Sequence, residues 1–216
     1  MDNSQLDCKK IFQKAFDKRY TWPDDFYGYK GRCIFQEKNE IIEGKFSLGK
    51  NFKPEIKNIS QEEIVKSISS QLFEVVIHRV KKDFDTIHSA NNFQFLRKSD
   101  YGIEMKVKGK NEGDKYRVKD DKINMVYRKI HGIIIEIFVE EFLNTGNGIL
   151  SKKYTSQTLN PNNLSKKSPK LKYVDNFIKL ENKEIWILES RTVSFLTKGN
   201  EELSHHFKFK DLELHD

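Results

Sequence analysis

The feature that most constrains the fold is a long series of short extended segments from about residue 93 to residue 214. Polar turns such as His131-Gly132 and Lys198-Gly199-Asn200 separate these segments. Connections this short join antiparallel neighbours, because a parallel return needs about a dozen residues or more. No helical pattern lies between the segments, which argues against a doubly wound fold. The sequence therefore predicts an antiparallel meander.

Two amphipathic helices are predicted before the meander. The first covers about residues 4–21 and ends before Pro23, because the residue before a proline avoids the α region. The second covers about residues 60–82, where Ser60 and Glu63 form a capping-box pattern. Its apolar face is formed by Ile64, Ile68, Leu72, Val75 and Val76. Each apolar face has to be buried, and a face of the sheet is the obvious partner.

These patterns predict an α+β fold. About 10–12 strands are expected to make one strongly curved antiparallel sheet, a half-barrel or a barrel, covered by the two helices. A chain of 216 residues is long enough for one such domain or for two small ones. The polar segment 160–170 is flanked by strands of the same meander, so residues 1–216 are expected to form a single domain.

The formal net charge of +7 has two explanations, which are solubility and attraction to an acidic partner such as a protein or a membrane surface. Basic and acidic residues are interleaved along the chain, and the densest basic stretch lies between Lys166 and Lys172. One short basic stretch does not indicate a nucleic-acid interface, so no nucleic-acid partner is expected.

The sequence shows neither a targeting signal nor a cysteine pattern, which indicates a reducing compartment. The first ten residues are polar and contain no apolar signal segment, and no run approaches the roughly 18 apolar residues of a membrane span. Cys8 and Cys33 give neither a disulfide framework nor a zinc spacing. We therefore expect a cytoplasmic or stroma-like protein without a transmembrane segment.

Motifs of known chemistry are absent. The sequence has no P-loop, no dinucleotide-binding glycine fingerprint, no His-Glu-x-x-His and no Gly-x-Ser-x-Gly. It therefore predicts no cofactor, no metal and no catalytic residues, and it favours a protein that is not an enzyme while leaving enzyme activity open.

Arg79 is the most informative local feature. At 100° per residue it falls between Ile68 and Leu72, inside the apolar face of the second predicted helix. Asp83 follows four residues later, within reach, and His78 lies on the flank. Arg79 either snorkels to water where the helix ends or forms a partly buried pair that orients an acidic ligand group.

The remaining candidates are histidines and aromatic residues. His205 shares a strand face with Phe207 and Phe209, and His131 lies at a turn, so that a metal site drawn from His78, His131 and His205 has no support from spacing. Trp22 and Tyr29 belong to an aromatic group after the first helix. That group either docks the helix on the sheet or forms a lip for an apolar ligand.

Several short stretches carry a resemblance to a known family. They are Arg19-Tyr20-Thr21-Trp22, Phe26-Tyr27-Gly28-Tyr29, Ile77-His78-Arg79-Val80, Ile130-His131-Gly132 and Phe207-Lys208-Phe209-Lys210-Asp211-Leu212. On these stretches most of the chain resembles an uncharacterised domain family of cyanobacteria and plastids, and the order of elements resembles the lipoprotein-carrier (LolA/LolB-type) fold. The resemblance implies a photosynthetic, non-secreted setting and no catalytic residues.

Three functions remain open. The first is non-enzymatic binding of a hydrophobic ligand, a lipid or pigment, in the concavity of the curved sheet. The second is a protein-interaction or assembly module for a photosynthetic complex. The third is an enzyme with an unrecognised site around Arg79, His131 and His205. The candidate ligand-binding residues are Arg79, Asp83, His78, His131, His205, Trp22 and Tyr29.

Overall fold

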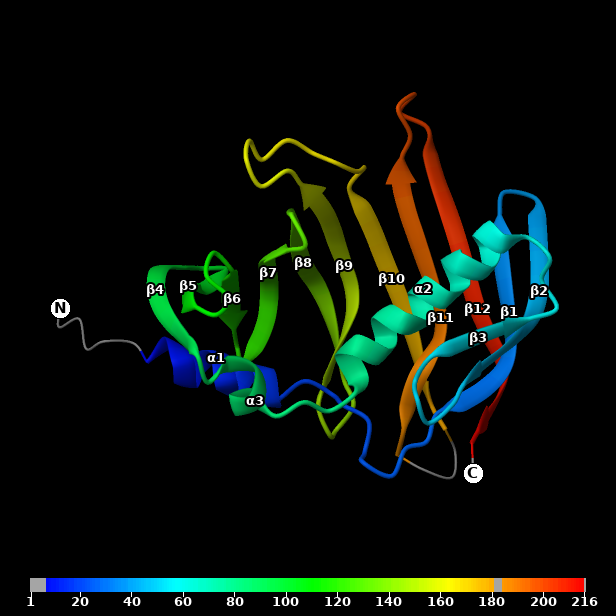
Figure 1. Cartoon of the computed structure of the whole chain (residues 1–216), viewed down its shortest axis with the longest axis horizontal. Helices are drawn as coiled ribbons and strands as arrows, with labels where there is room; N and C mark the ends of the chain where they lie inside the picture. The colour runs from blue at the N-terminus through cyan, green and yellow to red at the C-terminus, as the bar shows by residue number, and fades with distance from the viewer. Residues whose placement is uncertain (1–6, 181–183, 216) are drawn as a thin grey trace. The chain divides into compact units, whose positions relative to one another are not determined.

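The structure is a computed structural model that describes residues 7–180 and 184–215. Within these residues the chain forms three helices and twelve strands (Figure 1). They are α1 (Cys8–Asp17), β1 (Tyr29–Glu37), β2 (Glu40–Leu48), β3 (Pro54–Lys57), α2 (Glu62–Arg79), α3 (Phe84–His88), β4 (Asn91–Ser99), β5 (Gly102–Gly109), β6 (Lys115–Lys119), β7 (Lys122–Ile130), β8 (Ile133–Asn144), β9 (Ile149–Leu159), β10 (Leu171–Lys179), β11 (Trp186–Leu196) and β12 (Glu202–Leu214).

The strands belong to one hydrogen-bonded sheet with the order β3-β2-β1-β12-β11-β10-β9-β8-β7-β6-β5-β4. From β4 to β12 the order follows the chain, so the predicted α+β class and antiparallel meander are confirmed. The first hairpin, β1–β2, continues the sheet beyond β12. Because the order ends at β3 and β4, the sheet has two edges, and the predicted alternative of a closed barrel is wrong.

The chain divides into two compact units. The first unit comprises residues 1–20 and 82–172 and contains α1, α3 and β4 to β9. The second unit comprises residues 21–81 and 173–216 and contains α2, β1 to β3, β11, β12 and most of β10. The single domain over residues 1–216 stays a prediction.

The core of the first unit forms around Phe12 of α1. Its ring stacks on Phe93 of β4 at 4.7 Å between centroids and lies 4.4 Å from Tyr116 of β6. Through such contacts α1 packs against β4, β6 and β7. The helix begins at Cys8, where the Asp7 side chain caps it, and ends at Asp17 rather than near residue 21. Residues 4–6 of the predicted helix lie outside the described residues.

The core of the second unit forms under α2, which packs against β1 and β3. Of the predicted apolar face, Ile68, Leu72, Val75 and Val76 are buried and Ile64 is partly buried. The helix ends at Arg79 and not near residue 82, because Val80 is extended with φ −64° and ψ 122°. The next residues start the short helix α3, which the sequence analysis did not predict, with Asp83 as its N-cap.

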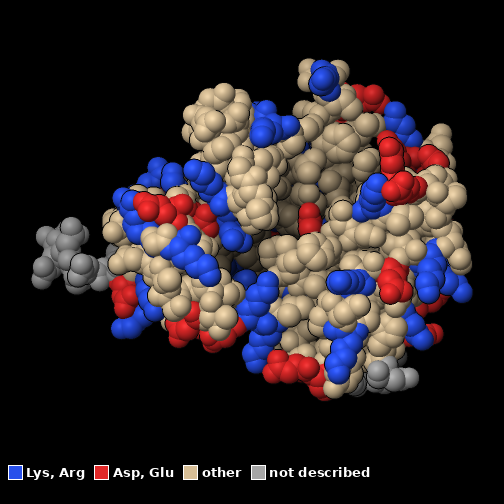
Figure 2. All heavy atoms as spheres, viewed as in Figure 1, with Lys and Arg blue, Asp and Glu red and all other residues tan. Residues whose placement is uncertain are grey.

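Charges of both signs are interleaved on the face seen in Figure 2, as the sequence predicts. Most ion pairs of the described residues join exposed side chains, for example Lys66 with Glu62 and Lys38 with Glu201. Exposed pairs of this kind contribute little to stability. Among the described residues, no helix is long and apolar enough to cross a bilayer.

His88 of α3 is buried in the core of the first unit. Its ring lies 5.3 Å from Phe12, and its Nδ1 is 3.0 Å from the side-chain nitrogen of Asn91. Burial, with smaller contributions from the charges of Arg128 and Arg19, lowers the pKa of His88 from 6.5 to about 4. The core of the first unit therefore contains a neutral histidine over the ordinary range of pH.

This depressed pKa predicts a specific pH dependence. Below pH 6.5 the unfolded chain binds a proton at His88 that the folded protein excludes until about pH 4. Stability is therefore lost as the pH falls, by about 1.5 kcal/mol between pH 6.5 and about pH 5, where most carboxylates are still ionised. Urea unfolding at a series of pH values measures this change. His88→Gln should flatten the profile, and an unchanged slope in that variant would contradict the assignment.

Candidate functional site

An apolar strip runs along β8 in the first unit. Ile133, Ile135, Ile137 and Val139 occupy alternate positions and therefore share one face of the sheet. Each of the four is partly exposed, although all are aliphatic. These four residues are called the β8 strip below.

The register of the sheet shows which face carries the β8 strip. Tyr116 lies directly opposite Val126 of β7, and Val126 lies directly opposite Ile137. Directly opposite residues share a face. Since Tyr116 packs on Phe12 of α1, the β8 strip lies on the face that carries α1. The helix packs on β4, β6 and β7, whereas the strip continues that apolar face onto β8.

Polar side chains border the β8 strip. Tyr154, Ser156 and Thr158 of β9 lie opposite Val139, Ile137 and Ile135. On the other side, Arg128 of β7 lies opposite Ile135 and donates from Nε to Asp114 over a long 3.4 Å. Asp114 is buried, forms an ion pair with Arg128, and also accepts from the Lys129 amide and the Tyr116 hydroxyl. This arrangement can accept an apolar chain with a polar end.

The opposite face of the same strands is covered by the segment 160–170. Lys170 lies 6.0 Å from the ring centroid of Phe138, and Gln157 donates to the Ser168 carbonyl. Lys166 forms a bridge with Leu159 at the end of β9. The loop therefore packs on the face away from the β8 strip.

A buried ion-pair cluster lies in the second unit. Arg191 of β11 is 4% exposed and makes two 2.7 Å bonds to the carboxylate of Asp175 on β10. It also donates to Glu74 at 2.9 Å and to Gln71 at 3.1 Å, both on α2. These four residues are called the Arg191 cluster below. The cluster ties α2 to two strands of the sheet.

Glu74 is the member of the Arg191 cluster that faces solvent, with 41% of its side chain exposed. Burial raises the pKa of Glu74, the charge of Arg191 opposes this effect, and Asp175 adds to it. Arg191 also lies 5.4 Å from the ring centroid of Tyr173. The guanidinium is thus enclosed by acceptors, which makes the cluster a structural tie.

Trp22 and Tyr29 lie in the interior of the second unit. Trp22 donates from Nε1 to the Trp186 carbonyl at 3.1 Å, and its ring contacts Phe26 and Phe52. Tyr29 is fully buried, burial raises its pKa, and its hydroxyl has no hydrogen-bond partner among the described protein groups. These contacts pack the unit, and a ligand-binding role for the two rings stays a prediction.

The structure places His78 and Arg79 on α2 and Asp83 outside that helix. Arg79 is the last residue of α2, and its guanidinium lies 5.8 Å from the ring centroid of Phe177 in the same unit. His78 is exposed beside it. Asp83 belongs to the first unit and accepts from the Thr86 amide at 2.8 Å. The expectation that Asp83 follows Arg79 on the same helical face is therefore wrong, because α2 ends between them.

His131 and His205 lie on separate elements. His131 is exposed at the β7–β8 turn of the first unit, with a positive φ of 48°. His205 of β12 lies in the second unit, 3.5 Å from a Glu37 carboxylate oxygen and next to Phe35 and Phe195. Within residues 7–180 and 184–215, no cluster of His, Cys, Asp and Glu is placed to hold a metal ion.

The sequence did not reveal the β8 strip or the partners of Arg191 in the Arg191 cluster. The signal for the strip is the run Ile133–Val139, in which Glu136 is the one charged residue, so that both faces are largely apolar although one face would suffice for a core. The signal for the cluster is a pair of opposite charges, Asp175 and Arg191, at buried positions of two neighbouring strands.

Breaking the Arg191 cluster should destabilise the second unit strongly. Asp175→Asn removes the bidentate partner and leaves a buried guanidinium with reduced compensation, at an expected cost of about 3 kcal/mol in the free energy of unfolding. Arg191→Met combined with Asp175→Leu should recover most of that loss, because neither charge then remains buried. Urea denaturation measures the free energy of unfolding of the wild type and of both variants.

The control is the exposed pair of Glu62 and Lys66 on the same helix. Lys66→Ala should change the free energy of unfolding by less than about 0.5 kcal/mol. Equal losses in Asp175→Asn and Lys66→Ala would show that the Arg191 cluster is not a structural tie.

Comparison with solved structures gives one distant similarity. A DUF1329 family protein from Desulfovibrio piger ATCC 29098 is 11% identical over 96% of this chain and 93% of that chain, with a TM-score of 0.30. A likeness at that level carries no argument about fold or ligand. A search of curated proteins finds no match.

Comparison with protein families gives a match over residues 3–215 to the family described as protein of unknown function (DUF3386). The resemblance to an uncharacterised family is thereby confirmed, whereas a cyanobacterial or plastid origin and a lipoprotein-carrier architecture stay predictions. Since the match covers nearly the whole sequence, the chain belongs to the DUF3386 family.

Proposed function

We propose that this protein binds an elongated hydrophobic ligand, a lipid or pigment chain, on the β8 strip of the first unit. The observation that carries the proposal is the partial exposure of four aliphatic side chains on the face that α1 covers farther along the sheet. Apolar surface left in water costs roughly 25 cal/mol per Å², so a ligand that covers the strip gains free energy.

The dimensions and border of the β8 strip favour a chain-like ligand. Alternate positions on a strand are about 6.7 Å apart, so four of them span about 20 Å. The hydroxyl side chains of β9 line one side, and Arg128 lies beside Ile135 on the other. An apolar chain with one polar or anionic end satisfies both parts of this surface.

Among the candidate residues of the sequence analysis, His131 is nearest to the proposed site. It lies in the turn that leads into β8, two residues before Ile133. Ligand roles for Arg79, Asp83, His78, His205, Trp22 and Tyr29 are not part of this site and stay predictions. The photosynthetic setting and the cytoplasmic or stroma-like location implied by the sequence also stay predictions.

A dye-binding experiment tests the proposal. Ile135→Gln combined with Ile137→Gln keeps side-chain length but removes apolar surface from the strip. We expect the affinity for the uncharged dye Nile red to fall by about tenfold or more, because two apolar contacts are lost. Native mass spectrometry of the gently purified wild-type protein should show co-purified lipid or pigment that the variant lacks.

The matched control is Ile41→Gln, which alters an isoleucine that is 59% exposed on β2 of the second unit. Its dye affinity and its melting temperature should equal those of the wild type. A double variant that remains folded and binds the dye as well as Ile41→Gln does would refute the β8 strip as the binding surface.

A protein-interaction module is the second candidate function, supported by the outer side of α2. Phe73 and Ile77 lie one turn apart on this helix and are 53% and 40% exposed, an unusual exposure for two large apolar residues in contact range. The outer side of α2 therefore offers an apolar patch in the second unit.

Phe73→Ser combined with Ile77→Ser should abolish retention of a protein partner from extracts of the source organism, while dye binding at the β8 strip stays unchanged. Phe95→Ser with Leu96→Ser, which removes exposed apolar residues from β4, is the control. Loss of the partner in both variants would point to general stickiness and not to a site on α2.

A further inference from the structure

Four cationic side chains form a straight row across the second unit. Arg32 of β1 lies directly opposite Lys210 of β12 on one side and Lys45 of β2 on the other. Lys45 in turn lies directly opposite Lys57 of β3. Neighbouring strands are about 4.8 Å apart, so the row spans about 14 Å. These four residues are called the cationic row below.

The cationic row lies on the face of the sheet away from α2. Cys33, Phe46 and Phe209, which neighbour the row along their strands, are buried toward the helix. The four cations are exposed. Strand alternation therefore places the row on the outer face, where a ligand can reach it without any movement of the helix.

Among residues 7–180 and 184–215, Arg32 is the member of the cationic row that forms ion pairs. Arg32 bonds to Asp211 and to Glu43, the latter at 3.3 Å. Among the described residues, no ion pair is found for Lys45, Lys57 or Lys210. Like charges directly opposite each other destabilise a sheet. The row is thus an arrangement that folding alone disfavours and that a bound anion would relieve.

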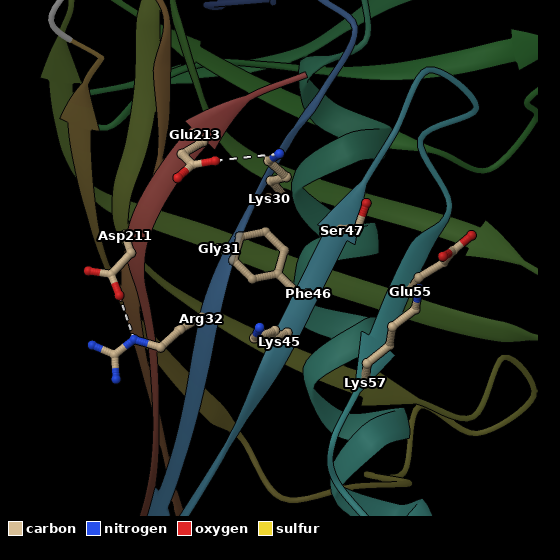
Figure 3. A pocket seen from close by; sticks show the side chains of 10 residues that line it. All are labelled: Lys30, Gly31, Arg32, Lys45, Phe46, Ser47, Glu55, Lys57, Asp211 and Glu213. Atoms are coloured by element: carbon tan, nitrogen blue, oxygen red, sulfur yellow. Dashed lines mark hydrogen bonds and ion pairs between the residues drawn. The ribbon is translucent and has the colours of Figure 1, made fainter. Parts of the chain in front are cut away.

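An open groove of about 520 Å³ contains part of the cationic row (Figure 3). Arg32, Lys45 and Lys57 line it, and the hydroxyl-bearing Ser47 adds a hydrogen-bonding group. In Figure 3 the dashed lines join Arg32 to Asp211 and Lys30 to Glu213, whereas none reaches Lys45 or Lys57. The volume is within the range of small-molecule sites.

Carboxylates flank the cationic row and limit the size of its partner. One step along the same face, Lys30 is opposite Glu213 and Ser47, and Ser47 is opposite Glu55. One step the other way, Glu43 of β2 is opposite Ile34. Along each strand the backbone positions of these rows lie about 6.7 Å from those of the cationic row, and the Glu43 side chain reaches back to Arg32 at 3.3 Å. A broad anionic surface would meet all of these carboxylates, whereas a compact anion between Lys45 and Lys57 meets fewer of them.

We propose that the cationic row binds a soluble small molecule that carries two or more linked phosphate groups. One phosphate would be placed between Lys45 and Lys57, and the next would extend along the row toward Arg32, whose Nε and one terminal nitrogen are already bonded to Asp211 and Glu43. This site lies in the second unit and does not depend on the β8 strip.

Isothermal titration calorimetry at low ionic strength, without divalent cations, tests the site with inorganic tripolyphosphate, pyrophosphate and orthophosphate. Tripolyphosphate should bind about tenfold more tightly than orthophosphate, because only the longer anion spans several cations. Lys45→Gln combined with Lys57→Gln should weaken tripolyphosphate binding by about tenfold or more. The same variant should show a raised melting temperature, because the opposed like charges are gone.

The matched control is Lys166→Gln combined with Lys167→Gln, which removes the same charge from the first unit. It should change tripolyphosphate affinity by less than about threefold. Absence of tripolyphosphate binding in the wild type, or equal losses in both double variants, would overturn the proposal. Retention on vesicles of equal parts phosphatidylcholine and phosphatidylserine that is lost with Lys45→Gln and Lys57→Gln would overturn it in favour of a lipid surface.

Discussion

Antiparallel pairing of each strand with its neighbour is the constraint on which the rest of the structure depends. Directly opposite residues share a face, so the register decides which side chains meet a helix and which meet water. In the first unit, this register places Ile137 on the same face as Tyr116. In the second unit, it aligns Lys45 with Lys57 on the face away from α2. A slip of one residue would move either set to the other face, so the proposed sites depend on the ladder that holds the fold.

The sequence predicted the elements whose signals are local. The meander from β4 onward and the apolar face of α2 follow from short-range periodicity and turn chemistry. Helix ends were less predictable. The break after Arg79 depends on Val80 adopting an extended conformation, and a β-branched residue at that point gives no strong stop signal. The five-residue helix α3 is too short to show a periodic pattern, and its Asp83 cap was interpreted as continuing the face of the helix before it.

The sites could not be predicted to the same extent, because they depend on contacts between distant segments. Arg191 meets Gln71 and Glu74 across more than half of the chain, and nothing in the sequence near Arg191 specifies those partners. The cationic row requires β12 to pair with β1, a pairing that joins opposite ends of the described chain. Residues that looked unusual in isolation, such as Arg79 and the histidines, turned out to lie on separate elements. Pairing order, and not local composition, determines which side chains become neighbours.

The position of β12 has a consequence for how the protein is made. This strand lies between β1 and β11, so the second unit joins segments from both ends of the sequence, whereas β4 to β9 of the first unit are contiguous. During synthesis on the ribosome, β1 emerges early and keeps an unpaired edge until β12 follows. Contacts of such high sequence separation form slowly, and an edge that waits for its partner is open to pairing with other chains. A chain whose synthesis ends before residue 202 would thus keep the edge of its first hairpin exposed and would be a natural target for chaperones.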